Sequence, residues 1–249
     1  MNLILLFPAE VSGDHVTLTD HRAEHVRTVL RSKSGDQLRV GLLNGPLGTA
    51  TVETVARGSV SLRLHLHGSV PQPCPTALIL ALPRPIMLRR VLAQATALGV
   101  ERIFLINANR VEKSFFQASL LRDEAYQAAL IQGLEQAMDT RLPAVSIHQR
   151  FRPFMEDVLP AYLADYPVRL LAHPTASAPL PEVAPLPLAE RAILAIGPEG
   201  GWVDFELDRF TACGFRPFTL GPRILRVDSA VPALLAQLEL LRHLPPTAG

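Results

Sequence analysis

The pattern of apolar and polar positions divides the chain into two parts with different periodicities. In the first part, apolar runs of strand length follow one another closely and are separated by turns, among which Asn44-Gly45 is a strong hairpin signal. Only 21–31 spaces its apolar residues as an amphipathic helix does. Strands are predicted at 3–7, 37–43, 48–55 and 60–66. Short strands with one helix indicate a small β-barrel.

The second part alternates strands with helices. The segment 76–82 is continuously apolar, which is typical of a strand that is covered on both faces of a parallel sheet. Further strands are predicted at 102–106, 168–172, 192–196 and 215–220, and helices at 85–98, 119–138, 154–163, 205–213 and 229–243. The proline-rich stretch 172–192 is predicted to be a loop. This alternation predicts an α/β fold with a mostly parallel sheet.

A proline-rich segment at 70–75 separates the two parts. Pro71, Pro73 and Pro75 stand at alternate positions, and each proline fixes its own φ and favours an extended residue before it. We therefore expect a stiff linker between a barrel domain at 1–70 and an α/β domain at 76–249.

Composition narrows the classes of protein that fit. Hydrophobic residues make up 48% of the 249 residues and charged residues 19%, which excludes intrinsic disorder. The formal net charge is +1, so any nucleic-acid site has to be a local basic patch. No apolar run reaches the length of a membrane span, and no secretory signal pattern precedes the first strand. The two cysteines, Cys74 and Cys213, have no metal-ligand spacing, so we expect free thiols, no metal and a cytoplasmic location.

The most distinctive local feature is the sequence IGPEGG at 196–201, which directly follows the predicted strand 192–196. Glycines allow a backbone to approach a ligand closely, and ligands of α/β sheets bind beyond the carboxyl ends of strands. The loop lacks the Gly-Lys-Ser/Thr ending of a phosphate loop and does not match GxGxxG. Taken alone, it also fits an ordinary strand-to-helix turn.

Two other predicted strands end in the same way. Gly221-Pro222 closes the strand 215–220, and His173-Pro174 closes the strand 168–172. Each pair by itself fits an ordinary turn. Together, three strand ends with small or cyclic residues can build one pocket from the main chain, which suits an adenine-bearing cofactor.

The paired motifs IGPEGG at 196–201 and LGPRILR at 220–226 resemble those of the ribosomal RNA small subunit methyltransferase E family, which are SPOUT-class enzymes. Weaker matches follow in the family's order along nearly the whole chain. They are HVRTVLR at 25–31 with GD at 35–36, QATALGV at 94–100, EQ at 135–136 with RLP at 141–143, and HP at 173–174.

The resemblance implies a PUA-like, RNA-binding barrel followed by a SPOUT-type α/β domain with a trefoil knot. It implies a homodimer whose active site lies near the subunit interface, with no membrane partner. The implied reaction uses S-adenosylmethionine to methylate N3 of one uridine in 16S ribosomal RNA, either free or in the small ribosomal subunit. The residues that it places at the cofactor are Leu171, His173, Gly197, Pro198, Glu199, Gly200, Gly201, Leu220, Gly221, Ile224 and Leu225.

The chain departs from the family pattern in three places. Arg84-Pro85-Ile86-Met87 replaces a glycine-lysine helix start, Met138-Asp139-Thr140 replaces G-R-N, and Arg226-Val227-Asp228-Ser229 replaces R-T-E-T/A. We expect these segments at the substrate rather than at the cofactor. They leave two alternatives open, which are an inactive RNA-binding relative and an active methyltransferase with a shifted RNA target.

The reaction needs groups that manage the proton on uracil N3. That N–H is weakly acidic, so a base or a cation beside the developing anion promotes methylation. Arg226 is the candidate cation and Asp228 the candidate base. Asp228 is equally a candidate N-cap of the following helix. Glu199 is a weaker candidate base, because a carboxylate between glycines can simply accept backbone N–H groups.

Two groups of basic residues are candidate RNA contacts. Arg22, Arg27, Arg31 and Lys33 form the first, and Arg84 and Arg89 the second. Either group can instead be an ordinary solvated face. Trp202 and Phe205, which follow the glycine loop, either pack in the core or stack on a base.

Overall fold

The computed structural model describes residues 2–72, 74–121 and 125–245. It contains two compact units, residues 1–72 with 131–142 and residues 73–130 with 143–249. The predicted barrel domain lies in the first unit. The predicted α/β domain lies in the second, except that 131–142 groups with the first. Met1, residue 73 of the linker, 122–124 of the predicted helix 119–138 and the C-terminal 246–249 lie outside the described residues.

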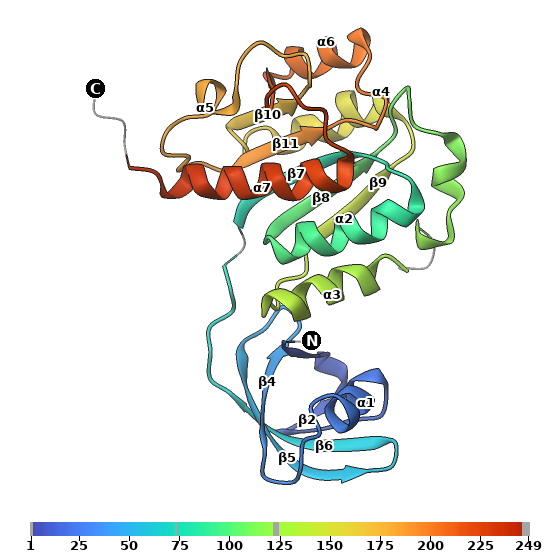
Figure 1. The fold of residues 1–249 in the computed structure, drawn as a ribbon, viewed down its shortest axis with the longest axis vertical. Helices are drawn as coiled ribbons and strands as arrows, with labels where there is room; N and C mark the ends of the chain where they lie inside the picture. The colour runs from blue at the N-terminus through green and yellow to red at the C-terminus, as the bar shows by residue number, and fades with distance from the viewer. Residues whose placement is uncertain (1, 73, 122–124, 246–249) are drawn as a thin grey trace. The chain divides into compact units, whose positions relative to one another are not determined.

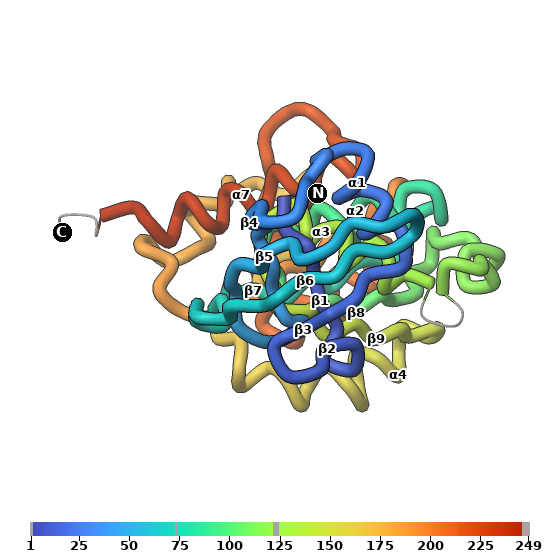
Figure 2. The backbone as a smooth tube through the Cα atoms, turned by 90° about the horizontal axis from the view of Figure 1, so that it is seen from below, coloured from blue at the N-terminus to red at the C-terminus, as the bar shows by residue number. Residues whose placement is uncertain are grey.

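The first unit is built on a six-stranded sheet with the order β1-β4-β5-β6-β3-β2. β1 pairs in parallel with β4 and all other neighbours are antiparallel, and Figure 2 shows β4, β5 and β6 running side by side. Alternate residues of these strands, such as Val60, Leu62 and Leu64, point into one hydrophobic core. The strands are β1 (Ile4–Leu6), β2 (Val11–Ser12), β3 (His15–Leu18), β4 (Gln37–Leu42), β5 (Leu47–Ala56) and β6 (Ser59–Leu66).

The sequence analysis missed β2 and β3. They are only two and four residues long. Buried residues alternate with exposed ones in β3 alone, where Val16 and Leu18 are buried. A single helical turn, η1 (Pro8–Glu10), leads from β1 into this hairpin.

Arg22 in helix α1 (His21–Thr28) is a buried structural residue of the first unit. Its guanidinium donates to Glu10 at 2.6 and 2.7 Å, to Asp20 at 3.0 Å and to the Leu5 carbonyl at 2.7 Å. The residue is 5% exposed, so its charge is neutralised inside the protein and does not face solvent. The predicted phosphate contact of Arg22 is therefore wrong, because these two carboxylates and one carbonyl occupy its donors.

The second unit is an α/β layer structure around a six-stranded, all-parallel sheet with the order β12-β10-β11-β7-β8-β9 (Figure 1). The α/β class with a parallel sheet is thus confirmed. β11 lies between β7 and β10, which both precede it in the chain, in agreement with the implied knotted order. The strands are β7 (Cys74–Ala81), β8 (Val100–Ile106), β9 (Ala144–His148), β10 (Val168–Ala172), β11 (Ala192–Ile196) and β12 (Arg216–Phe218).

Helices cover this sheet. α2 and α7 pack against each other, as Figure 1 shows. The α-helices of the second unit are α2 (Pro85–Ala97), α4 (Phe151–Pro153), α5 (Leu180–Val183), α6 (Asp204–Ala212) and α7 (Val227–His243). α3 (Gln127–Ala137) is divided between the two units, since its residues from 131 onward group with the first. None of the helices within the described residues combines the length and apolar character of a membrane span.

Two predicted helices differ from the observed ones. The segment predicted as a helix at 119–138 contains the turn η3 (Ser119–Leu121) and α3, which begins at Gln127. The segment 154–163 is an irregular helical run, η4 (Phe154–Val158) and η5 (Leu159–Tyr162), because Pro160 cannot donate an N–H to a regular helix. The predicted loop 172–192 contains α5. Another turn, η2 (Lys113–Gln117), follows β8.

Candidate functional site

Three parallel strands end at the same edge of the sheet. Ala172 of β10 is the register partner of both Ile196 of β11 and Phe218 of β12. Each of these residues is the last of its strand, so the turns that follow leave the sheet side by side. The carboxyl edge of a parallel sheet is where α/β proteins bind ligands.

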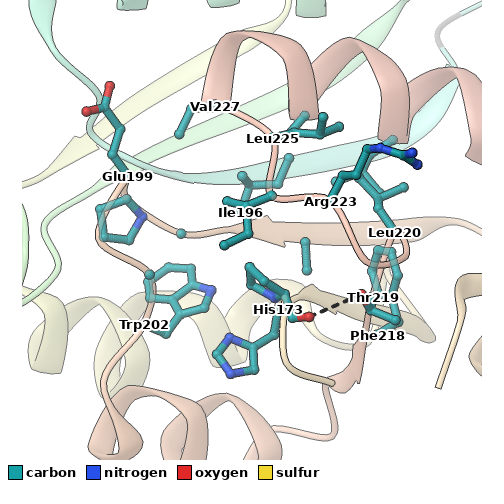
Figure 3. A pocket seen from close by; sticks show the side chains of 18 of the residues that line it. His173, Ile196, Glu199, Trp202, Phe218, Thr219, Leu220, Arg223, Leu225 and Val227 are labelled. Atoms are coloured by element: carbon teal, nitrogen blue, oxygen red, sulfur yellow. Dashed lines mark hydrogen bonds between the residues drawn. The ribbon is translucent and has the colours of Figure 1, made fainter. Parts of the chain in front are cut away.

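The three turns surround one cavity, which Figure 3 shows from close by. It holds about 680 Å³ of space, its open mouth included. The predicted cofactor residues that line it are His173, Gly197, Pro198, Glu199, Gly201, Leu220, Gly221, Ile224 and Leu225.

Two predicted cofactor residues do not line this cavity. Leu171 is 0% exposed within β10, and the following residue, Ala172, reaches the cavity instead. Gly200 faces the other way, because a Cβ placed there would lie 3.0 Å from Cδ of Arg110. The 197–201 loop therefore has two faces, of which only one borders the cavity.

Trp202 forms one wall of the cavity. It is 3% exposed and packs edge-on against Phe210, with ring centroids 5.0 Å apart. A Cβ at Gly197 would lie 3.0 Å from Nε1 of the indole, so any side chain there would press on Trp202. The structure agrees with core packing of Trp202, whereas Phe205 is 49% exposed with the Arg209 guanidinium 5.1 Å from its ring centre.

Local hydrogen bonds hold the turns in place. The Gly201 N–H donates to the Pro198 carbonyl at 2.8 Å, and the Gly221 N–H donates to Oγ1 of Thr219 at 3.1 Å. Gly201 has φ +76° and Gly221 φ +112°, which favours glycine at both positions. Oγ1 of Thr219 also lies 3.3 Å from the Pro174 carbonyl and so links the first turn to the third.

The polar atoms in this cavity fit a nucleoside-type ligand. Nδ1 of His173 and Nε1 of Trp202 are buried and have no hydrogen-bond partner among the described residues. The surrounding walls, which include Ile196, Val227 and Leu234, are apolar. An apolar cleft with a few uncommitted polar groups and exposed main chain is what adenine and ribose need, so these residues fit S-adenosylmethionine.

Burial lowers the pKa of His173, and the nearby negative charge of Asp204 only partly opposes this effect. Its Nε2 lies 2.9 Å from Oγ1 of Thr175. The imidazole is therefore neutral at neutral pH, which keeps a positive charge out of the cavity.

Two further residues hold the far face of the 197–201 loop, and the sequence analysis missed both. Arg110, which follows β8, donates from its guanidinium to the Gly200 carbonyl. Glu206 of α6 is 2% exposed and accepts from the N–H groups of Asn109 at 2.7 Å and Val203 at 3.0 Å. The sequence offers only weak signals that would have identified these two residues. Arg110 follows a strand end, and Glu206 is the third residue of a helix that follows a glycine loop.

The predicted catalytic pair lies beside the cavity and does not line it. Arg226 is exposed at the N-cap position of α7, between the lining residues Leu225 and Val227. Oδ2 of Asp228 accepts a hydrogen bond from Nη1 of Arg90 at 3.2 Å. Asp228 is not the N-cap, because the helix already begins at Val227.

The segment at 138–140 lies in the first unit and forms a turn that uses its own polar groups. Oδ1 of Asp139 accepts the Thr140 N–H at 2.6 Å and the Arg141 N–H at 2.8 Å. The Thr140 hydroxyl donates to the Gly45 carbonyl at 2.6 Å. This departure from the family pattern is therefore accommodated as local structure.

The remaining basic candidates are exposed. Arg27 pairs with Glu24 at 2.6 Å, whereas Arg31 and Lys33 have no ion-pair partner in the described part of the chain. In the second unit, Arg84 lies 3.4 Å from Glu199 and Arg89 is exposed on α2. Within the described residues, no group of three or more His, Cys, Asp or Glu side chains is placed to hold a metal ion.

Comparison with known proteins finds matches over both units. Residues 70–239 match a family model described as an RNA methyltransferase domain, and residues 18–64 match one described as an RNA methyltransferase PUA domain. A ribosomal RNA small subunit methyltransferase E of Treponema pallidum is 31% identical over 95% of this chain and 90% of its own. The corresponding protein of Synechocystis is 30% identical over 96% of this chain and 77% of its own.

Solved structures share the fold. The Neisseria gonorrhoeae ribosomal RNA small subunit methyltransferase E bound to S-adenosyl methionine has a TM-score of 0.78 at 22% identity, over 97% of this chain and 98% of its own. A putative methyltransferase of Legionella pneumophila with bound cofactor SAM has a TM-score of 0.76 at 24% identity, over 96% and 97%.

Proposed function

Because the chain belongs to the ribosomal RNA small subunit methyltransferase E family, we propose that it methylates N3 of one uridine in 16S ribosomal RNA with S-adenosylmethionine as methyl donor. The observation that carries the proposal is the convergence of the turns after Ala172, Ile196 and Phe218 on one cavity. The apolar walls and the unpartnered polar atoms of this cavity fit the nucleoside part of the cofactor.

The cofactor supplies a methyl group that is already activated by its sulfonium charge. The chain's own residues have to seat it, exclude water and orient the RNA. His173, Gly197, Gly201 and Gly221 seat the nucleoside part between apolar walls. We propose that exposed Arg226, next to the lining residue Leu225, stabilises negative charge on the uracil, so that Arg226→Ala lowers turnover more than cofactor affinity.

We further propose that the PUA-type first unit binds the ribosomal RNA, that the protein acts as a homodimer and that it works in the cytoplasm. The family match at 18–64 and the exposed residues Arg31 and Lys33 support the first of these proposals. Sedimentation analysis of the purified protein tests the dimer.

The decisive experiment is transfer of labelled methyl from S-adenosylmethionine to 16S ribosomal RNA, offered free and as assembled small subunits. Mass spectrometry of the RNA then maps the modified nucleotide. Label on one uridine at N3 is the expected result. Label on another nucleotide indicates a shifted target, and cofactor binding without any transfer indicates an inactive RNA-binding relative.

Affinity for S-adenosylmethionine is expected to be constant above pH 6.5, the ordinary pKa of histidine, and to fall as pH drops through the lowered pKa of His173. A protonated imidazole in the cavity would repel the sulfonium cation, so binding is favoured by the neutral form, which predominates above the pKa. Calorimetric titrations across this range test the expectation. S-adenosylhomocysteine, whose sulfur is uncharged, should show a smaller dependence, and the acid dependence should disappear in His173→Gln.

Arg31→Ala is expected to weaken binding of ribosomal RNA and to flatten its salt dependence by about 0.7 in the slope of log K against log salt concentration. Loss of one phosphate contact has this effect because fewer counterions are released. Filter-binding titrations at several salt concentrations measure the slope. Arg63→Ala is the matched control in the same unit, since Arg63 pairs with Glu53 at 2.7 Å. Equal slopes for both variants would contradict the assignment of Arg31.

A further inference from the structure

A second cavity lies on the other face of the 198–200 turn, and we name it the outer hollow. It holds about 510 Å³ of space, its opening included. It shares Pro198 and Glu199 with the cofactor cavity, so this turn is a common wall of the two. The residues that line it are Leu82, Pro83, Arg84, Arg110, Val111, Glu112, Phe115, Pro198, Glu199 and Gly200.

Opposite charges face each other in the outer hollow. Nε of Arg84 lies 3.4 Å from Oε2 of Glu199, and the two side chains are 61% and 38% exposed. An ion pair this exposed contributes little stability, so both groups are free to exchange partners when a ligand enters. Figure 3 shows that the Glu199 carboxylate points away from the cofactor cavity.

Arg110 connects the hollow with the cofactor loop. Its guanidinium donates to the Gly200 carbonyl, while its aliphatic stem covers the Cα of Gly200, where a Cβ would lie 3.0 Å from Cδ. Phe115 adds an aromatic side chain to the same hollow. The hollow therefore combines two guanidinium donors, carboxylate acceptors and a ring.

This set of groups complements one pyrimidine better than the other. The pairing edge of uracil presents two carbonyl acceptors, O2 and O4, on either side of the N3–H donor. The two guanidinium groups and the Glu199 carboxylate of the outer hollow supply the donors and the acceptor that this edge requires. Cytosine presents an unprotonated N3, which a carboxylate would repel. The aromatic ring of Phe115 provides a stacking partner for a base that has left its helix.

We propose that the outer hollow receives the target uracil and that Glu199 accepts the N3 proton, an inference that rests on the proposed function. Arg84 and Arg110 donate to the carbonyl oxygens, and Phe115 stacks on the ring. The Glu199 carboxylate first takes the N3 proton, and the electron pair of the N3–H bond stays on nitrogen. That pair then forms the new bond to the methyl carbon as the carbon–sulfur bond breaks, and the electrons of the carbon–sulfur bond go to sulfur, which leaves S-adenosylhomocysteine. Asp228 is not needed as a base, since it pairs with Arg90 at 3.2 Å.

The first test compares Glu199→Gln with wild type. A general base contributes about 10²–10⁴-fold, so the single-turnover methylation rate is expected to fall by at least about 100-fold. Affinity for S-adenosylhomocysteine, measured by calorimetry, should fall much less than the rate, because Gln keeps the shape of the wall that Glu199 gives to the cofactor cavity. Arg150→Ala, an exposed arginine at the start of α4, is the control for a surface change in the same unit.

The second test locates the bound target uracil and does not depend on methyl transfer. Ribosomal RNA with 4-thiouridine at the methylated position is irradiated in complex with the protein and S-adenosylhomocysteine, and the crosslinked peptide is sequenced. Crosslinks are expected within 82–84, 110–115 or 198–200, and Phe115→Ala should reduce them. A crosslink only at other residues, an unchanged rate in Glu199→Gln, or a loss of its cofactor affinity as large as its loss of rate would overturn the inference. A wild-type protein that methylates no ribosomal RNA would instead refute the proposed function.

Discussion

Gly197→Val is expected to lower affinity for S-adenosylmethionine by at least about 100-fold, or about 2.8 kcal/mol. The new side chain would begin 3.0 Å from Nε1 of Trp202. Trp202 is 3% exposed and packs against Phe210, so any shift of the indole would change the wall that it gives to the cavity. The substitution would therefore distort the cavity at the place where the turn after β11 exposes its main chain. Calorimetry with purified protein measures the loss, and a thermal melt without ligand checks that the fold is kept.

Gly200→Ala provides the matched control in the same loop. Its added methyl group would contact the Arg110 side chain at 3.0 Å, on the face turned away from the cofactor cavity. An exposed, flexible arginine can shift at little cost, so affinity for the cofactor should remain close to wild type. If Gly197→Val bound the cofactor normally, or if Gly200→Ala lost as much affinity, the assignment of the two faces would be wrong.

Arg22→Ala is expected to destabilise the first unit by about 3–5 kcal/mol, the usual cost of removing one partner of a buried ion pair. Glu10 and Asp20 would lose their cation, and the Leu5 carbonyl would lose a donor at 2.7 Å. The single tryptophan, Trp202, lies in the other unit and would not report this change. Hydrogen exchange of peptides from β1, β4 and α1 is therefore the suitable measurement.

The comparison for this prediction is Arg27→Ala in the same helix. Arg27 pairs with Glu24 across three residues on an exposed surface, and such pairs contribute about 0.3–0.5 kcal/mol. If Arg27→Ala lost as much hydrogen-exchange protection as Arg22→Ala, the buried contacts of Arg22 would not be what stabilises this unit.

Acid should weaken the same network in the wild-type protein. Burial tends to raise the pKa of Asp20, but its hydrogen bonds to Arg22 and the charge of Arg22 outweigh this and lower it below the ordinary value of 3.8. A lowered pKa in the folded state contributes stability above pH 3.8, and this contribution is lost as pH falls through the folded-state pKa. In Arg22→Ala the acid dependence due to Asp20 should be absent.

The cavity could be anticipated from the sequence because its elements follow from local rules. The strands 168–172 and 192–196 are bounded by residues that cannot continue them, and their observed ends coincide with the predicted ones. Once a parallel sheet is inferred, the turns after these strands must leave from one edge. The glycines at 197, 201 and 221 then stand where the backbone has to turn.

Other parts depend on partners that are distant in the sequence and could not be anticipated. Arg22 looks like an exposed helix cation until Glu10 and the Leu5 carbonyl are placed beside it. Arg110 contacts a glycine carbonyl ninety residues away, and no periodicity marks that contact. The pairing of Asp228 with Arg90 likewise arises from the packing of α2 against α7.

The turn at 198–200 provides a route by which the occupants of its two neighbouring cavities would influence each other. A ligand on one side that fixes Pro198 and Glu199 removes freedom that a ligand on the other side would otherwise have to remove. Linkage is reciprocal, so the factor by which the bound methyl donor would raise the affinity for RNA equals the factor by which bound RNA would raise the affinity for the methyl donor. With the target uracil in the outer hollow, as proposed, the enzyme would retain its methyl donor more firmly once the correct nucleotide has arrived.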